Sequence, residues 1–92
     1  MQFMIIWKTR PDTIRQAVAR FLETGGKVPK GSKSLGRWHR ADISGGWHPI
    51  EADKVGPVLQ HCAEWADVLE LSVVPVTTDN EAGEAMTKVF GK

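Results

Sequence analysis

The order in which strand-like and helix-like hydrophobic patterns follow one another along the chain limits its fold more than any other feature of the sequence. Short apolar runs, typical of strands, alternate with longer segments in which apolar residues recur every three or four positions, as on one face of a helix. Residues 3–7 form such an apolar run, and residues 35–41, 47–52 and 69–76 also read as strands, with a turn between the second and the third. The segments that predict helices are residues 11–24, 53–66 and 79–90.

This succession is the βαββαβ order of ferredoxin-like α+β domains. It predicts a four-stranded antiparallel sheet with two helices on one face, followed by a short C-terminal helix. We also expect the first and last strands to lie in the centre of the sheet. With 92 residues, the chain is predicted to form a single domain over residues 1–92.

The first and last apolar runs carry apolar side chains on both faces. In the first run Ile5 points to one side and Met4 to the other, and Val73 and Val74 do the same in the last run. A sheet covered by helices on one face only should alternate apolar with polar residues. The terminal helix or a second copy of the chain must therefore cover the second face. We expect a homodimer packed sheet to sheet, because burying each large side chain contributes about 1.5–3 kcal/mol.

Charge balance and cysteine content argue against several classes of protein. A formal net charge of +1 is too small to favour nucleic acid or an anionic membrane as the main partner. Cys62 is the single cysteine, so no disulfide can form within the chain. The apolar opening run stops at Lys8, which is too early for a signal-peptide core or a membrane span. We expect a cytoplasmic protein without a cofactor, a nucleic-acid partner or a membrane partner.

Two Trp-His pairs, Trp38-His39 and Trp47-His48, lie on the expected hairpin and flank Gly45-Gly46. Alternation along a strand directs the indole and the imidazole of each pair to opposite faces. If the two pairs meet with an odd offset, one histidine faces the helices and the other faces the opposite side. Trp38-His39 is then the better candidate for a site, and Trp47-His48 is expected to be structural.

The register of this hairpin decides what Glu51 can do. One register sets Arg40 opposite Glu51, which is an ordinary cross-strand ion pair. A shift of one residue sets His39 opposite Glu51. A carboxylate-oriented imidazole of that kind is what a general base needs.

Two functions remain open for the hairpin. The first is a small-molecule site in the cleft between sheet and helices, with His39 as the catalytic group beside Arg37 and Glu51. Its ligand-binding residues would be Arg37, Trp38, His39, Trp47 and His48. The second is a dimeric scaffold or interaction module without chemistry, in which the indoles are core and the imidazoles are satisfied polar ends. A solvent-connected cavity beside His39 would favour the first function, and dense packing would favour the second.

The remaining reactive side chains predict no further site. His61 lies away from the apolar stripe of its helix and is expected at the surface. Cys62 belongs to that stripe, so we expect a buried and unreactive thiol. The histidines and carboxylates show no recognised ligand spacing, and no metal site is predicted.

A resemblance to a known family covers nearly the whole chain. It is carried by Trp65 of the second helical segment, by Asp67 just after that segment, and by the stretches 3–7, 20–25, 36–39, 51–53 and 73–76, which read FMIIW, RFLETG, GRWH, EAD and VVPV. These residues resemble DUF3303, a small bacterial family of unknown function. That family is similar to the dimeric α/β-barrel group, in which two ferredoxin-like domains join their sheets into a barrel.

The resemblance implies expectations about assembly and activity. It implies a homodimer of the dimeric α/β-barrel kind. The group includes cofactor-free monooxygenases, haem-degrading enzymes, isomerases and domains without known activity. Cofactor-free oxidation or proton transfer on a small molecule is therefore the activity that the resemblance implies, although kinship of fold is an associational argument.

Overall fold

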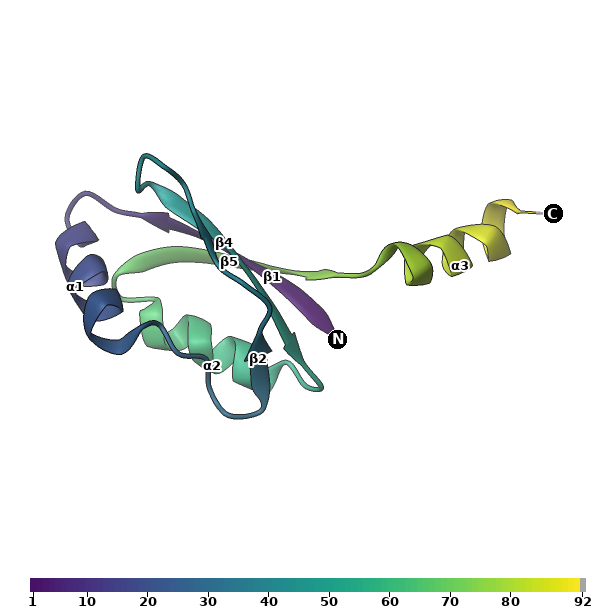
Figure 1. The fold of residues 1–92 in the computed structure, drawn as a ribbon, viewed down its shortest axis with the longest axis horizontal. Coiled ribbons are helices and arrows are strands. Elements are labelled where there is room, and N and C mark those ends of the chain that lie inside the picture. Colours follow the sequence, from purple (N-terminus) through teal and green to yellow (C-terminus); the bar gives the residue numbers. More distant parts are fainter. Residues whose placement is uncertain (92) are drawn as a thin grey trace.

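The computed structural model describes residues 1–91 and has the expected ferredoxin-like α+β architecture (Figure 1). The strands are β1 (Gln2–Thr9), β2 (Ser32–Ser34), β3 (Trp38–His39), β4 (Gly45–Ala52) and β5 (Leu69–Val76). The helices are α1 (Ile14–Thr24), α2 (Gly56–Trp65) and α3 (Asp79–Phe90). The helices α1 and α2 lie on one face of the sheet, as predicted (Figure 1).

The sheet is antiparallel throughout, with the strand order β2-β4-β1-β5 and with β3 also paired to β4. The expected central position of the last strand is wrong, because β5 forms an edge. Both β4 and β5 run antiparallel to β1, so they are parallel to each other and need the long connection through α2. That connection carries the chain across β1, which together with β4 occupies the centre.

The predicted strand over residues 35–41 is found only at Trp38–His39, and its other residues are not in a strand. Two short strands pair with β4, first β2 and then β3, and the strand pairing is interrupted between them. Gly36 lies at the break with φ 145°, a backbone conformation that side chains other than glycine rarely adopt. A Cβ on Gly36 would lie 2.9 Å from the Trp38 ring, so the indole also needs this glycine.

The core occupies the space between the sheet and the two helices. Its buried cluster consists of Phe3, Ile5, Ile50, Ala52 and Val58. At the surface, an ion pair links α1 to the segment that follows α2: the guanidinium of Arg20 contacts the carboxylate of Asp67 at 2.8 Å. The sheet face toward the helices is therefore packed over much of its length, apart from the pocket described below.

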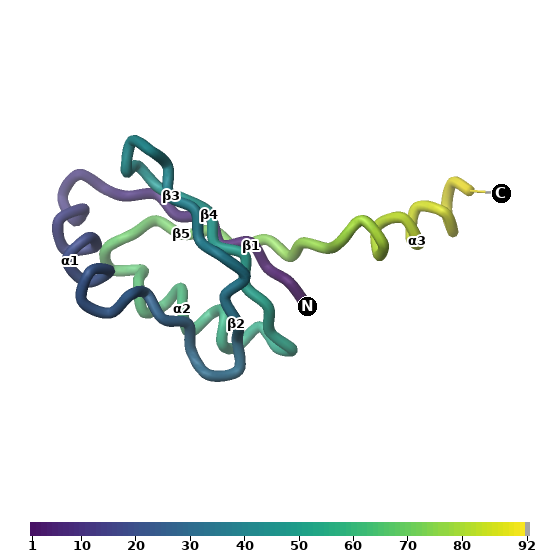
Figure 2. Tube along the Cα trace, in the orientation of Figure 1, coloured from purple at the N-terminus to yellow at the C-terminus, as the bar shows by residue number. Residues whose placement is uncertain are grey.

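The opposite face of the sheet, which we call the open face, has no covering layer within residues 1–91. The pairing register directs an apolar set to it, comprising Met4, Ile6, Trp38, Trp47, Val74 and Val76. Helix α3, found at the predicted residues, does not cover this face. It continues outward from β5 and stands clear of the rest of the chain (Figure 2). None of the helices within residues 1–91 has the length and apolar character that crossing a membrane requires.

Candidate functional site

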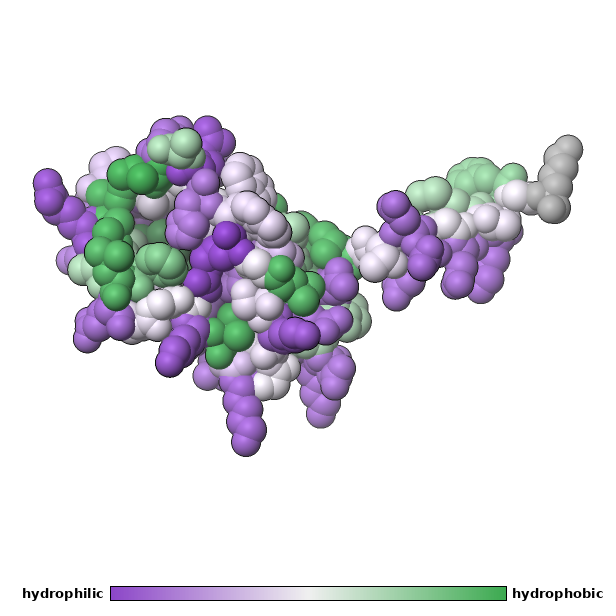
Figure 3. Space-filling view, in the orientation of Figure 1, coloured by the Kyte–Doolittle hydropathy of each residue, from purple (hydrophilic) through white to green (hydrophobic). Residues whose placement is uncertain are grey.

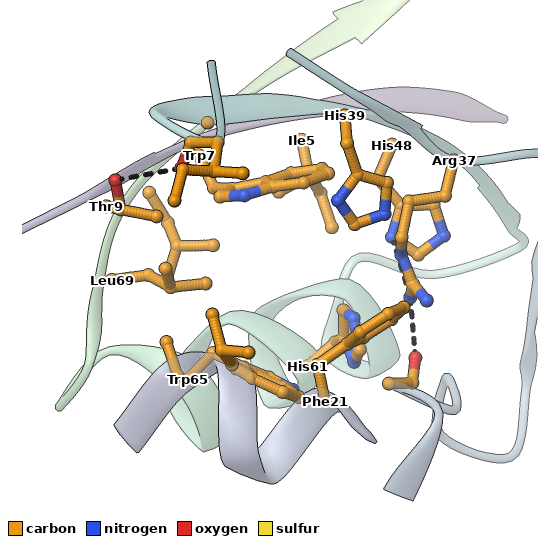
Figure 4. A pocket seen from close by; sticks show the side chains of 16 residues that line it. Ile5, Trp7, Thr9, Phe21, Arg37, His39, His48, His61, Trp65 and Leu69 are labelled. Atoms are coloured by element: carbon orange, nitrogen blue, oxygen red, sulfur yellow. Dashed lines mark hydrogen bonds between the residues drawn. The ribbon is translucent and has the colours of Figure 1, made fainter. Parts of the chain in front are cut away.

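A pocket of about 260 Å³ lies between the sheet and the helices (Figure 4). Trp7 of β1 lies on the sheet side of this sheet–helix pocket, while Phe21 of α1 and Trp65 of α2 lie on the helix side. Arg37, His39 and His48 gather at one end, and Thr9 and Leu69 lie at the other. The remaining lining residues are Ile5, Ala17, Val18, Gly26, Ile43, Gly45, His61 and Leu71. The pocket is thus an aromatic and aliphatic slot with a polar end.

Arg37 holds the polar end together. Its Nη1 donates to the Gly25 carbonyl at 3.0 Å, and its Nη2 donates to the Gly26 carbonyl. The guanidinium carbon also lies 5.5 Å from the centre of the Phe21 ring. Burial lowers the pKa of Arg37 from its ordinary value, although an arginine stays protonated in proteins. The side chain therefore brings a positive charge to the pocket and ties the end of α1 to the loop before β3.

His48 is buried in β4, with 2% of its surface exposed, and both of its ring nitrogens have partners. Its Nδ1 lies 3.4 Å from Arg37 Nη2 and its Nε2 lies 2.9 Å from Ser34 Oγ. Because arginine can only donate, Nδ1 accepts and Nε2 carries the proton that it donates to Ser34. Burial lowers the pKa of His48 to about 4, with smaller contributions from the charges of Arg37 and His61. His48 is a neutral imidazole with a fixed tautomer.

His61 also faces the pocket, and the prediction that it lies at the surface is wrong. It is 6% exposed, and its ring stands edge-on to His48 with the two ring centres 5.5 Å apart. Its buried Nδ1 has no hydrogen-bond partner among residues 1–91, and Glu64 Oε1 lies 4.0 Å away. Burial and the charge of Arg37 lower the pKa of His61, against the opposing effect of Glu64. All three histidines of the chain therefore line one pocket.

His39, like His61, makes no ring hydrogen bond within residues 1–91, but His39 is exposed whereas His61 is buried. The His39 ring lies between Trp7 and Phe21, with ring centres 5.3 Å from each. Within the described part of the chain, no side chain or backbone group makes a hydrogen bond to this ring. The histidines do not form a metal centre, since no three His, Cys, Asp or Glu side chains of residues 1–91 are placed to share an ion. His39 can thus donate to or accept from a molecule in the pocket.

The structure corrects the expected roles of the tryptophans on the hairpin. Trp38 pairs directly with Trp47, and both indoles lie on the open face, away from the pocket. The expectation that they line the cleft is wrong. Since both indoles point away, His39 and His48 both point toward the helices, so the expected separation of the two histidines is wrong as well.

The structure also corrects the expected role of Glu51. In the sheet it lies opposite Gln2 and Lys33, and neither His39 nor Arg40 reaches it. Arg40 instead contacts Asp42 within the turn, with Nε 3.3 Å from Oδ1. Glu51 is therefore removed from the site, and His39 has no carboxylate to orient it.

Several pocket residues lie outside the hairpin and were not expected at the site. Trp7, Phe21 and Trp65 supply its aromatic walls, yet in the sequence each belongs to an ordinary apolar stripe. The sequence pattern does place all three rings on the core-facing sides of their strand or helices, and this is the one feature that could have indicated them. Ile43, at the rim, has φ 59°, which is unusual for a β-branched residue and strains the turn.

Comparisons with known proteins give little about activity. No curated protein matches the chain significantly. A solved structure described as "Structure of Rv0793 from Mycobacterium tuberculosis" is similar at 15% identity and a TM-score of 0.46, covering 86% of this chain and 98% of its own. A family model described as "Domain of unknown function (DUF3303)" matches residues 1–90. The chain belongs to the DUF3303 family.

Proposed function

We propose that this protein binds a small, flat, mostly apolar molecule with one ionisable oxygen in the sheet–helix pocket, and that His39 exchanges a proton with it. The observation that carries the proposal is the shape and lining of the pocket. Trp7 faces Phe21 and Trp65 across the slot, so a planar ring between them would contact aromatic surface on both sides. Pockets of this kind, apolar with a few convergent polar groups, are typical of small-molecule sites.

The volume limits the size of the ligand. An engineered protein cavity of about 150 Å³ binds benzene, which is an established reference for such volumes. A pocket of about 260 Å³ has room for a substituted single ring or for two fused rings. Larger ring systems would have to protrude at the rim near Ile43.

The polar end favours an oxygen that can be negatively charged. Arg37 contributes a positive charge, while His48 is already committed to Ser34 and Arg37. His39 remains to receive a proton from a phenol, a carboxylic acid or an acidic C–H, and the anion formed would lie near Arg37. Proton transfer and cofactor-free oxidation both begin with this removal of a proton. In the oxidation, the substrate anion is the reductant and dioxygen the oxidant.

The test is a thermal-shift assay with 2-naphthol, 2-naphthoic acid and naphthalene. We expect the two oxygen-bearing probes to raise Tm more than naphthalene does, because only they engage the polar end. His39→Ala should remove the advantage of 2-naphthol over naphthalene, whereas 2-naphthoic acid, which is already a carboxylate at neutral pH, should keep the share that comes from Arg37. Arg40→Ala is the matched control, since Arg40 adjoins His39 in sequence but does not line the pocket. Equal shifts in wild type and His39→Ala would contradict the role of His39, and no shift with any probe would contradict the ligand class.

A second candidate is a dimeric scaffold without chemistry. It is favoured by the exposed apolar side chains of the open face, of which Trp38 is 59% and Trp47 is 41% exposed. A dimer in which none of the probes binds would support this function over the first. For either function we expect a cytoplasmic location, because the one thiol is half-buried and a reducing compartment suits it.

A further inference from the structure

His61 is a buried polar side chain of α2 that has no hydrogen bond inside the domain. It is 6% exposed, and its buried Nδ1 has no partner among residues 1–91. Buried polar atoms in proteins are nearly always hydrogen-bonded, so each exception needs a physical reason. The ring of His61 lines the sheet–helix pocket, where a bound molecule can supply what the domain does not (Figure 4).

Glu64 is the acid that can orient this imidazole. It follows His61 by three positions, so the two side chains are neighbours on α2, and its Oε1 lies 4.0 Å from Nδ1. The Glu64 side chain is 52% exposed, which leaves it free to move the short distance that a hydrogen bond needs. In the described part of the chain, no other histidine has a carboxylate this close. A carboxylate can only accept, so Nδ1 of His61 carries the proton and Nε2 keeps its lone pair.

The three histidines of the pocket then have different capacities for a ligand. His48 has the opposite tautomer, and both of its nitrogens are already engaged by Ser34 and Arg37. His39 comes from the sheet, whereas His61 comes from the helix layer (Figure 4). A flat ligand between the two layers therefore has one imidazole with a free nitrogen on each side.

The apolar walls make such partners necessary. Apolar side chains gather at the surface over α1 (Figure 3), and α1 contributes Ala17, Val18 and Phe21 to the lining. A ligand that enters loses its water against these walls. A polar group left without a partner in such a site is strongly disfavoured, so a ligand with two polar groups needs two partners.

We propose that His61, oriented by Glu64, is a second proton acceptor of the pocket, and that the ligand carries two ionisable groups, one for His39 and one for His61. This inference rests on the proposed small-molecule function and narrows its ligand class. The proton of the second group moves to Nε2 of His61, and the ligand keeps the electron pair as an anion. Nδ1–H stays hydrogen-bonded to Glu64, whose negative charge stabilises the imidazolium that forms. Glu64 is thus a positioning residue.

The first experiment needs no ligand. Long-range proton–nitrogen NMR spectra at about pH 7.5, above the ordinary pKa of histidine, show which ring nitrogen carries the proton. We expect it on Nδ1 of His61 in the wild type and on either nitrogen in Glu64→Ala. The titration of His61 should also move to lower pH in Glu64→Ala, because Glu64 raises the pKa of His61.

Glu23→Ala is the matched control for these spectra, since it removes an exposed carboxylate of α1 that contacts no histidine. It should change neither the tautomer nor the titration. A proton on Nε2 in the wild type, or a Glu64→Ala variant whose His61 signals match those of the wild type, would overturn the role of Glu64.

The second experiment compares 2-naphthol with 2,3-, 1,3- and 2,7-dihydroxynaphthalene, each of which adds one hydroxyl to it. By titration calorimetry, we expect at least one of the three to bind at least about tenfold more tightly than 2-naphthol, because it engages both histidines. His61→Phe keeps a ring without nitrogens and should abolish this preference. Glu64→Ala, at an exposed position that tolerates substitution, should weaken it.

The outcomes separate this inference from the function on which it rests. If 2-naphthol binds and no diol is preferred, or if the preference survives in both variants, the role of His61 is overturned and the small-molecule function stands. If none of the four probes binds, the ligand class of both proposals is overturned. The NMR spectra then report on the pairing of Glu64 with His61 alone.

Discussion

The buried neutral His48 makes the stability of this protein depend on pH in a defined direction. Above its ordinary pKa of 6.5, the imidazole is neutral in both the folded and the unfolded chain and contributes no pH dependence. Between 6.5 and the folded pKa of about 4, the unfolded chain takes up a proton that the folded chain does not. The free energy of unfolding must therefore fall as the pH falls through this window. His61, whose pKa is also lowered, acts in the same direction.

The magnitude follows from the two pKa values. For a base with pKa 6.5 unfolded and about 4 folded, proton linkage gives a loss of about 2 kcal/mol between pH 7.5 and pH 5. The assay is equilibrium urea unfolding, followed by the fluorescence of the four tryptophans at one fixed protein concentration. His48→Gln keeps a side-chain N–H donor but cannot titrate, so it should lose about 2 kcal/mol less than the wild type over the same interval.

The comparison uses the change with pH, not the absolute stability, so it remains informative if glutamine packs poorly. His61→Gln is the companion variant and should remove the share that His61 contributes. The reasoning is refuted if His48→Gln loses as much stability between pH 7.5 and pH 5 as the wild type. That result would mean that the folded protein accommodates a charged His48 beside Arg37.

Three further predictions concern the backbone and the thiol. Gly46→Ala should lower the free energy of unfolding in urea by more than about 2 kcal/mol, because the new Cβ would lie 2.2 Å from the Trp38 carbonyl oxygen. Gly56→Ala, where a Cβ meets nothing within 4 Å, should change it little, and equal losses would contradict the steric argument. Ile43→Gly should raise the free energy of unfolding by about 1 kcal/mol through relief of the left-handed backbone, and a lower midpoint in urea would count against that strain. Burial raises the pKa of the Cys62 thiol, so a bulky maleimide should label it far more slowly in the native protein than in urea, and equal rates would show an accessible thiol.

Elements with a sustained pattern could be predicted from the sequence. Residues 69–76 and 79–90 are found at the predicted bounds, because the mostly apolar strand pattern of the first and the helical stripe of the second each specify one period. The short strands could not be found this way. Residues 32–34 read Ser-Lys-Ser, and they form a strand only because β4 offers them a partner. The backbone conformation of Gly36 then interrupts the strand before β3, so two short strands form where one was expected.

The candidate site was predicted in part. Arg37, His39 and His48 do lie at one pocket, whereas Glu51 and the two hairpin tryptophans do not. Register caused this error, because the turn from Arg40 to Ser44 and its hydrogen bonds to Asp42 set which residues face each other. The position of His61 was mispredicted because α2 is rotated about its axis relative to the expected apolar stripe. The sheet contacts the helix through Val58 and His61, while Leu59 of the expected stripe is 65% exposed.

Arg37 couples the pocket to the folding of α1. Its guanidinium donates hydrogen bonds to the carbonyl oxygens of Gly25 and Gly26, just after the last residue of α1. Without these hydrogen bonds the C-terminal end of α1 would fray more readily. An anionic ligand that accepts the N–H groups now bonded to Gly25 and Gly26 competes with these two carbonyls for Arg37. A ligand that accepts only the other N–H groups of Arg37 leaves both hydrogen bonds in place and holds the side chain more firmly. Amide hydrogen exchange in residues 20–26 would therefore speed up or slow down on binding, and its sign would reveal how the ligand engages the arginine.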